Sequence, residues 1–345
     1  MEQNEALSPD IKKSAKRQVM KISVITACIV MGIIIFTNAV FIGIVALMGD
    51  SFTTFTEKYL DEISSSLVIQ DIVMIIGLIV GAVLLKVDIK SHFAKPQMKI
   101  SEIISLGVMG IGLAQIASVG INIVMTLIEQ LTGAEIGQVT FIAERNLPST
   151  IFMFIAMAFI GPVLEELFFR GLFFTPLIPH GRTFAVVATA IIFGLYHMNI
   201  PQILPAMIMG FFFAYISVES RSIIPAMCIH IINNTLAAID YVCLAGIDLN
   251  KMSDINYITE NSGKLIPLFI VVGIIYACIF ASIPLFIVRL VKRGKNAFRV
   301  SGSENDGKVL KNSELAKAYF LNPAVIILLI MVIGMTAFTV IGGRG

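Results

Sequence analysis

Residues 161–171, GPVLEELFFRG, place Glu165, Glu166 and Arg170 inside an apolar run from about 149 to 176. A helix needs about 20 apolar residues to cross a bilayer, and this run is long enough. An ionisable side chain at membrane depth costs about 3 kcal/mol or more, so it marks a functional site by default. Three such side chains within six positions strengthen that prediction.

The composition places this run in a membrane protein. Of the 345 residues, 57% are hydrophobic and 14% are charged, whereas soluble domains carry about 25% charged residues. We therefore expect an all-α, polytopic protein that crosses the cell membrane several times. The lipid bilayer is an expected partner, and a nucleic acid is not.

Nine apolar segments are candidates for spanning helices. The segments at 183–199 and 201–217 are short and nearly continuous, so they form either a tight helical hairpin or a partly re-entrant pair. The nine segments are residues 22–48, 66–86, 103–130, 149–176, 183–199, 201–217, 222–243, 265–290 and 322–342.

The basic residues predict the orientation of these helices. With the N-terminus in the cytoplasm, the inner segments hold 19 of the 25 Lys and Arg residues and the outer segments hold 5. An excess of basic residues in short loops marks the cytoplasmic side. The predicted organisation is a cytoplasmic leader at 1–21, N-terminal helices at 22–130, a catalytic core at 145–243, and C-terminal helices at 265–345 with a solvated basic cytoplasmic loop at 289–320.

The charged residues of the fourth segment divide into two groups. Glu166 and Arg170 are four positions apart, so they share a helix face and can pair. Glu165 is rotated from Glu166 by about 100° and needs a different partner. Pro162 is expected to bend the helix. The alternative is a buried ion-pair cluster that only fixes helix packing.

Two histidines lie in other apolar segments, each with a companion four positions away. His197 follows Phe193, and His230 precedes Asn234. One such histidine alone is more often a hydrogen-bonded core residue. At 1.5 Å per residue from the cytoplasmic end, Glu165 lies ~16 Å deep, His197 ~21 Å, His230 ~13 Å and Asn234 ~19 Å. All four therefore fall near the middle of a core about 30 Å thick.

This set of side chains suits the hydrolysis of an amide. A glutamate in an apolar surrounding can act as general base on water, and a histidine can orient that water. A second histidine and a carboxamide can donate to the oxyanion. Glu165, His197 and His230 could also bind zinc, although helical zinc sites usually use HExxH and the sequence has none.

Three motifs together resemble the CAAX-protease and bacteriocin-processing (Abi, CPBP) family of intramembrane proteases. They are Glu165-Glu166-x-x-x-Arg170, Phe193-x-x-x-His197 and His230-x-x-x-Asn234, and the resemblance covers about 145–240. It implies an endopeptidase that cuts a peptide or a membrane-associated protein. It implies that Glu165 and His197 activate water and that His230 and Asn234 stabilise the oxyanion. Glu166, Arg170 and Phe193 are then supporting residues.

The resemblance leaves the metal question open. The family has been called a metalloprotease and is also interpreted as a metal-free glutamate protease. The missing HExxH favours the second interpretation, so we expect no required cofactor, with zinc as the alternative. Prenylated substrates are known for some relatives, but no segment of this sequence points to a prenyl pocket.

Other classes of protein fit less well. The chain lacks the GxSxG of a rhomboid-type serine protease and the GxGD of a presenilin-type aspartyl protease; Asp71 and Asp240 lie near the outer ends of their helices. A transporter would show a repeat, and none is found. The non-enzyme alternative is a membrane scaffold or bacteriocin-immunity protein that retains the pocket without turnover.

Overall fold

The computed structural model describes residues 8–58, 62–133, 146–301 and 309–342, which are helical and contain no strand. The expected all-α class is confirmed, because each of the nine apolar segments forms a helix within these residues. The helices are α1 (Pro9–Met48), α3 (Glu62–Leu85), α4 (Ile100–Thr132), a composite helix over Leu147–His180, α7 (Arg182–Tyr196), α8 (Ile200–Ser220), α9 (Ile224–Leu244), α11 (Ser262–Arg293) and α13 (Pro323–Gly342).

Seven of the described helices are long and apolar enough to cross a membrane. An eighth span is obtained if α12 (Asn312–Phe320) and α13 count as one span bent by 67°. The remaining apolar helix is α7, which has only 15 residues and is shorter than a full span. The prediction of about nine spanning helices is therefore close, and the chain is a multi-pass membrane protein.

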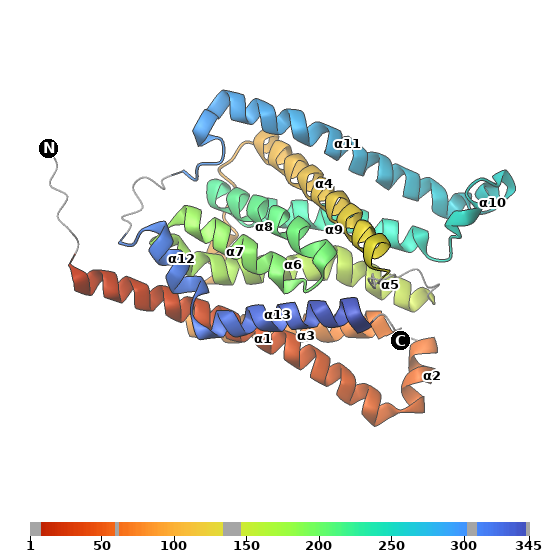
Figure 1. Cartoon of the computed structure of the whole chain (residues 1–345), viewed down its shortest axis with the longest axis horizontal. Helices are drawn as coiled ribbons and strands as arrows, with labels where there is room; N and C mark the ends of the chain where they lie inside the picture. Colours follow the sequence, from red (N-terminus) through yellow and green to blue (C-terminus); the bar gives the residue numbers. More distant parts are fainter. Residues whose placement is uncertain (1–7, 59–61, 134–145, 302–308, 343–345) are drawn as a thin grey trace.

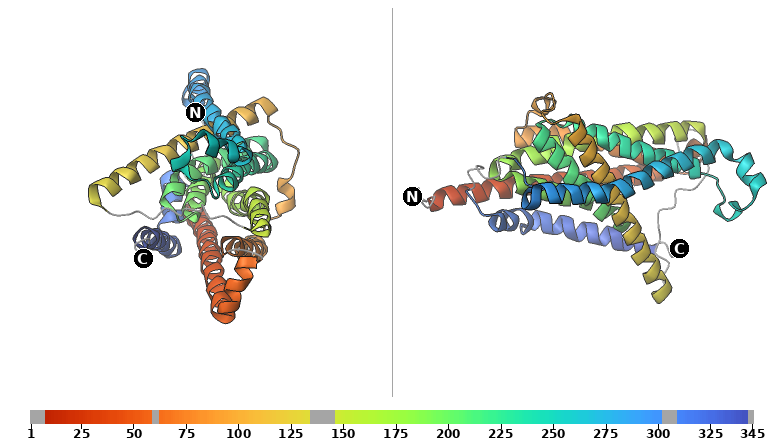
Figure 2. Two further views of the ribbon diagram at one scale, coloured as in Figure 1. Left: turned by 90° about the vertical axis from the view of Figure 1, so that its right-hand side faces the viewer. Right: turned by 90° about the horizontal axis from the view of Figure 1, so that it is seen from above.

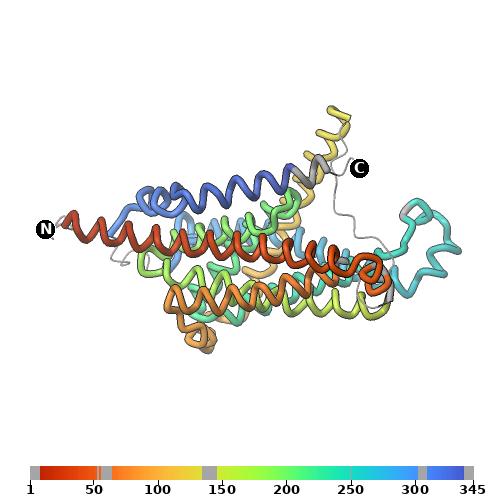
Figure 3. Tube along the Cα trace, turned by 90° about the horizontal axis from the view of Figure 1, so that it is seen from below, coloured from red at the N-terminus to blue at the C-terminus, as the bar shows by residue number. Residues whose placement is uncertain are grey.

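The helices are arranged around a central group (Figures 1 and 2). In Figure 1, α4 and α11 lie along one side and α1, α3 and α13 along the other, with α6 to α9 between them. Helix α8 packs against α4, α7 and α9. Figure 3 shows α1 along the length of the molecule, and α3 and α13 both contact it. The predicted catalytic segment thus lies in the middle of the molecule.

The outer helices present apolar side chains away from this centre. Phe36 on α1 is 65% exposed and Phe280 on α11 is 73% exposed. Such surfaces suit contact with lipid chains, which are as apolar as the side chains themselves. Between the helices, in contrast, small residues allow close approach: Gly112 of α4 faces the backbone oxygen of Cys278 and the side chain of Ser282.

Helix α1 begins earlier than the sequence indicated. The leader expected at 1–21 is helical from Pro9, where Ser8 caps the helix by accepting a hydrogen bond from the Ile11 N–H at 3.4 Å. Serine before a first-turn proline is a favourable helix start. Ala15 and Val19 are buried, and α1 packs against α12. Packing therefore extends the helix through a polar segment.

The basic loops meet at one end of the molecule. The Gln97 N–H donates to Ser220 O at 2.8 Å, the Ile223 N–H to His92 O at 3.0 Å, and Arg182 Nη1 to Ser301 O at 2.9 Å. Helices α2 (Asp50–Lys58) and α10 (Ile255–Glu260) lie at the opposite end (Figure 1). This arrangement matches the predicted alternation of loops, and the cytoplasmic position of the N-terminus stays a prediction.

The segment expected to be a solvated basic loop at 289–320 is folded in its described parts. Helix α11 continues to Arg293, and α12 occupies Asn312–Phe320. Arg289 is only 9% exposed; its Nη2 donates to Tyr215 Oη at 2.8 Å and its Nε to Ala297 O at 2.6 Å. The interpretation as a solvated linker is therefore wrong for Arg289, because these partners replace water.

The short segments form α7 and α8, which pack against each other as a tight hairpin. The connection contains Met198 in the left-handed region at φ 49°. Gly194 makes the close approach possible: a Cβ there would lie 2.6 Å from Ile203 O and would overlap the Met207 side chain. His197 therefore lies at the end of α7, where the chain turns into α8.

Candidate active site

The paired glutamates lie on a composite helix whose turns change width. It runs as α5 (Leu147–Ile155), the π-helix η2 (Ala156–Ile160), α6 (Gly161–Glu166), the π-helix η3 (Leu167–Phe174) and the 3-10 helix η4 (Thr175–His180). Pro162 was expected to bend this helix. Instead the helix widens before it, and the Gly161 N–H donates to Ala156 O, five positions back. Such wide turns are frequent at functional sites.

Glu166 lies at the centre of a buried polar group. Its Oε1 accepts a hydrogen bond from Arg170 Nη1 at 3.0 Å, and His230 Nδ1 lies 2.9 Å from the same oxygen. The exposed fraction is 0% for Glu166, 1% for Arg170 and 4% for His230. The expected Glu166–Arg170 pair is present, and His230 joins it from α9.

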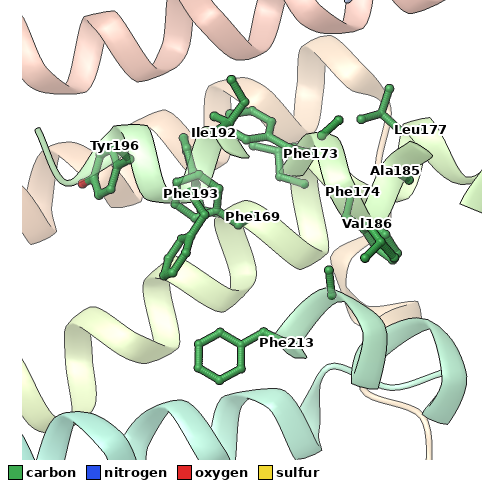
Figure 4. Packing of buried hydrophobic residues seen from close by; sticks show 14 of the residues in the cluster. Phe169, Phe173, Phe174, Leu177, Ala185, Val186, Ile192, Phe193, Tyr196 and Phe213 are labelled. Atoms are coloured by element: carbon green, nitrogen blue, oxygen red, sulfur yellow. The ribbon is translucent and has the colours of Figure 1, made fainter. Parts of the chain in front are cut away.

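Arg170 is held by backbone and aromatic rings in addition to Glu166. Its Nη2 donates to Gly210 O at 3.1 Å, and its guanidinium carbon lies 4.5 Å from the centre of the Phe193 ring and 5.1 Å from that of Phe213. Aromatic faces stabilise a desolvated cation. Figure 4 shows Phe193 with Phe169 beside it, and Phe213 on another helix below them. Phe193 thus contacts the charge and does not only fill space.

The partner of Glu165 is a residue other than Arg170, as the rotation of Glu165 from Glu166 predicted. Its Oε2 lies 3.5 Å from His230 Nε2, and its side chain is 13% exposed. His230 therefore stands between the two carboxylates, with one ring nitrogen toward each. The ring also stacks on Phe213 at 4.7 Å with an interplanar angle of 26°, which fixes its plane.

His197 and Asn234 are oriented by backbone carbonyls. His197 Nδ1 lies 2.9 Å from Phe193 O. Because a carbonyl oxygen only accepts, Nδ1 carries the proton and Nε2 is left as an acceptor. Asn234 Nδ2 donates to Met157 O at 3.2 Å, and its Oδ1 accepts from Asn233 Nδ2 at 3.1 Å. A carboxamide nitrogen has two N–H groups, so one is left for another acceptor.

A cavity of about 480 Å³ brings the predicted residues together. Glu165, His197, His230, Asn234 and Phe193 all line it, whereas Glu166 and Arg170 do not. The lining also includes polar side chains from four other helices that the sequence did not assign to the site: Asn38, Gln70, Asp71, Gln115 and Gln202. No lysine or arginine is among the described residues that line it.

Asp71 is the acidic residue that sequence reasoning missed. It was judged to lie near the outer end of its helix and to lack a protease motif. The structure places it on α3 against the same cavity as Glu165. The rule that marks an ionisable residue within an apolar span as functional would have selected it.

The zinc alternative was tested against the geometry. Across the described ranges, no group of three or more His, Cys, Asp or Glu side chains is arranged to hold a metal ion. Of the expected set, Glu165 Oε2 and His230 Nε2 lie 3.5 Å apart, and His197 directs its Nδ1 to Phe193 O. The three side chains therefore do not form a metal-binding cluster as they stand.

Comparison with known proteins finds sequence similarity in the part of the chain that contains this site. Residues 147–236 match the family described as "Type II CAAX prenyl endopeptidase Rce1-like". The chain is also 32% identical over 88 residues to the "Putative membrane peptidase YdiL" of Bacillus subtilis (strain 168). That similarity covers 25% of this chain and 36% of YdiL, so about a third of the relative's length is matched. No solved structure matches the chain significantly.

Proposed function

We propose, from the match of residues 147–236 to the CAAX-protease family, that this chain is an intramembrane endopeptidase that hydrolyses a peptide bond of a peptide or membrane-associated protein. Its active site is the cavity that holds Glu165, His197, His230 and Asn234. The bond is cleaved by a water molecule, with no covalent intermediate on the protein.

The observation that carries the proposal is the position of His230 between two glutamates. If His230 Nδ1 donates to Glu166, a neutral ring would turn its Nε2 lone pair toward the Glu165 carboxylate. A proton shared between Nε2 and Glu165 Oε2 removes this repulsion. With that proton, the charges of Glu165, Glu166, Arg170 and His230 sum to zero, which reduces the cost of burying them. His230 can thus donate a hydrogen bond toward each of the two carboxylates.

The proposed reaction uses this arrangement in two steps. Glu165 takes a proton from a water molecule that His197 Nε2 orients, and the water oxygen adds to the carbonyl carbon of the substrate. The oxyanion that forms accepts a hydrogen bond from the Nε2–H of His230, which Glu165 releases once it is protonated, and another from the free N–H of Asn234. Glu165 then gives its proton to the leaving nitrogen as the C–N bond breaks, which restores the carboxylate.

Replacement of one carboxylate tests the proposal. Purified protein in lipid nanodiscs is incubated with a peptide library, and new peptide ends are measured by mass spectrometry. Glu165→Gln should lower cleavage at least ~100-fold, because general base catalysis typically contributes 10²–10⁴-fold. Asp240→Asn on α9 is the matched control: Asp240 does not line the cavity, and its variant should cleave as the wild type does.

The same variant separates the enzyme from the scaffold or immunity alternative. If cells that carry Glu165→Gln keep the full phenotype of the wild type, turnover is not what the protein is needed for. If wild-type protein cleaves no peptide under conditions in which it is folded, the endopeptidase proposal is wrong.

Chelation tests the metal-free form of the reaction. The residues described provide a base, an orienting histidine and oxyanion donors without a metal, so activity should survive exhaustive chelation. Complete loss that zinc restores would show that a metal completes the site, with Glu165, His197 and His230 as its ligands.

A further inference from the structure

A second cavity lies at the end of the molecule where the basic loops meet. Its volume is about 230 Å³, which is enough for several waters or one small anion. Its lining comes from three segments that the distribution of basic residues assigned to the same side, and it includes His92, Arg182 and Arg221. It shares no described lining residue with the larger cavity around Glu165.

The charged side chains among the described residues that line this second cavity are all basic. Arg170, Arg182 and Arg221 line it, and no aspartate or glutamate is among its described lining residues. Glu166 neutralises Arg170 in part, and Arg182 donates one hydrogen bond to Ser301 O. Arg221 is exposed and occupies the left-handed region at φ 56°, a position that usually holds glycine at a helix end. The arginines therefore converge without acidic residues in the lining.

Two buried polar atoms on residues that line this cavity have no hydrogen-bond partner among the residues that the structure describes. They are Ser217 Oγ, on a side chain that is 6% exposed, and Arg170 Nε, on one that is 1% exposed. A buried polar group without a partner destabilises the folded protein, so such groups usually bind water, an ion or a ligand. Both residues line the cavity, and both atoms can donate a hydrogen bond.

From these observations we propose that the second cavity binds a phosphate group. Arginine binds phosphate oxygens through several hydrogen bonds, and the Ser217 and Ser222 hydroxyls add further donors. A tetrahedral anion with several oxygens matches this set better than a two-oxygen carboxylate does. The group comes either from an anionic lipid headgroup or from a soluble phosphate, and both present the same chemistry to the cavity.

The test measures binding directly and does not depend on peptidase activity. The full chain is placed in phosphatidylcholine nanodiscs, and its unfolding temperature is followed as inorganic phosphate replaces chloride at constant ionic strength. A ligand that binds only the folded protein raises this temperature in a saturable way. A second arm replaces free phosphate by phosphatidic acid in the nanodisc.

Three variants assign the effect to the cavity. Arg221→Gln should weaken phosphate binding at least ~10-fold, because a hydrogen bond to a charged group contributes about that much. Ser217→Ala should weaken it by a smaller factor. Lys95→Gln removes an exposed charge from the same end without touching the cavity and should leave binding unchanged.

Each outcome decides the proposal. Stabilisation by inorganic phosphate that Arg221→Gln weakens supports a soluble ligand, and stabilisation by phosphatidic acid alone supports a lipid headgroup. If neither raises the unfolding temperature of the wild type, the proposal is wrong. Equal losses in Arg221→Gln and Lys95→Gln would also overturn it, since they would show diffuse surface charge in place of a site.

Discussion

Among single residues, His230 matters most for the chemistry of the candidate active site, because each of its two ring nitrogens contacts a different carboxylate. The sequence predicted the Glu166–Arg170 pair, because a spacing of four on a helix determines that contact locally. It also separated Glu165 from that pair by rotation. It did not predict that His230 would contact both carboxylates, because His230 lies 64 positions from Glu166 and the contact depends on how α6 and α9 pack.

The buried ion pair gives a prediction on stability. Arg170→Met leaves Glu166 buried without its cation, and we expect the free energy of unfolding to fall by about 3–5 kcal/mol. The double variant Glu166→Gln with Arg170→Met should recover part of this loss, because no uncompensated charge is left. Denaturant unfolding in detergent micelles measures both. Losses that add without recovery would show that the two residues do not act as a pair.

His92 gives a prediction on pH. Partial burial lowers the pKa of His92 below its ordinary value of 6.5, an effect that Asp88 opposes. The unfolded chain therefore binds more protons at this position than the folded protein does, and stability must fall as the pH drops below about 6.5. The unfolding temperature of His92→Gln, measured from pH 7.5 to pH 5, should fall less steeply. An identical slope in wild type and variant would contradict this assignment.

At the scale of elements, hydrophobic length predicted that each helix exists but not where it begins or how its turns are wound. Helix α1 starts 13 residues before its apolar segment, because Ser8 caps it and α12 packs against the helix. The π-helical turns of η2 and η3 flank α6, which carries Pro162. The apolar periodicity of the sequence does not distinguish such turns from those of an α-helix.

The α7–α8 hairpin gives a prediction at this scale. In Gly194→Ala the new Cβ would overlap Met207 and press on Ile203 O, so we expect a loss of about 1–3 kcal/mol in the free energy of unfolding. Gly120→Ala on α4 is the matched control, since a Cβ there meets no atom within 4 Å. It should be neutral or stabilising. Equal effects of both variants on denaturant unfolding would show that the close approach is unimportant.

At the scale of the whole molecule, the distribution of charge predicted which loops lie together. The four basic connections between helices meet through backbone and side-chain hydrogen bonds at one end. The larger cavity around Glu165, in contrast, is lined in part by polar side chains from helices that carry no protease motif. Gln115 and Gln202 could not be assigned to it from one sequence, because only the packing of distant segments brings them together.

The predicted orientation can be tested on the intact membrane. Single cysteines are introduced at Lys95 and Lys251, which are both exposed and lie on opposite connections. The native cysteines are replaced first. A membrane-impermeant thiol reagent added to intact cells should label position 251 and spare position 95. The reverse labelling pattern would place the N-terminus on the outer side.

The wide turns of the composite helix determine the angle, about the helix axis, between the residues near one cavity and the residues that line the other. An α-helix turns by about 100° for each residue, so a segment wound more widely leaves whatever follows it at a different angle. Between Glu166, which contacts His230, and Thr175, which lines the second cavity, the chain is π-helical. Removing a single residue there would let the segment tighten and would turn Thr175 and the loop with Arg182 away from Arg170. The number of residues in η3 therefore fixes how Thr175 is oriented relative to Glu166, and so how the two cavities are placed about this helix.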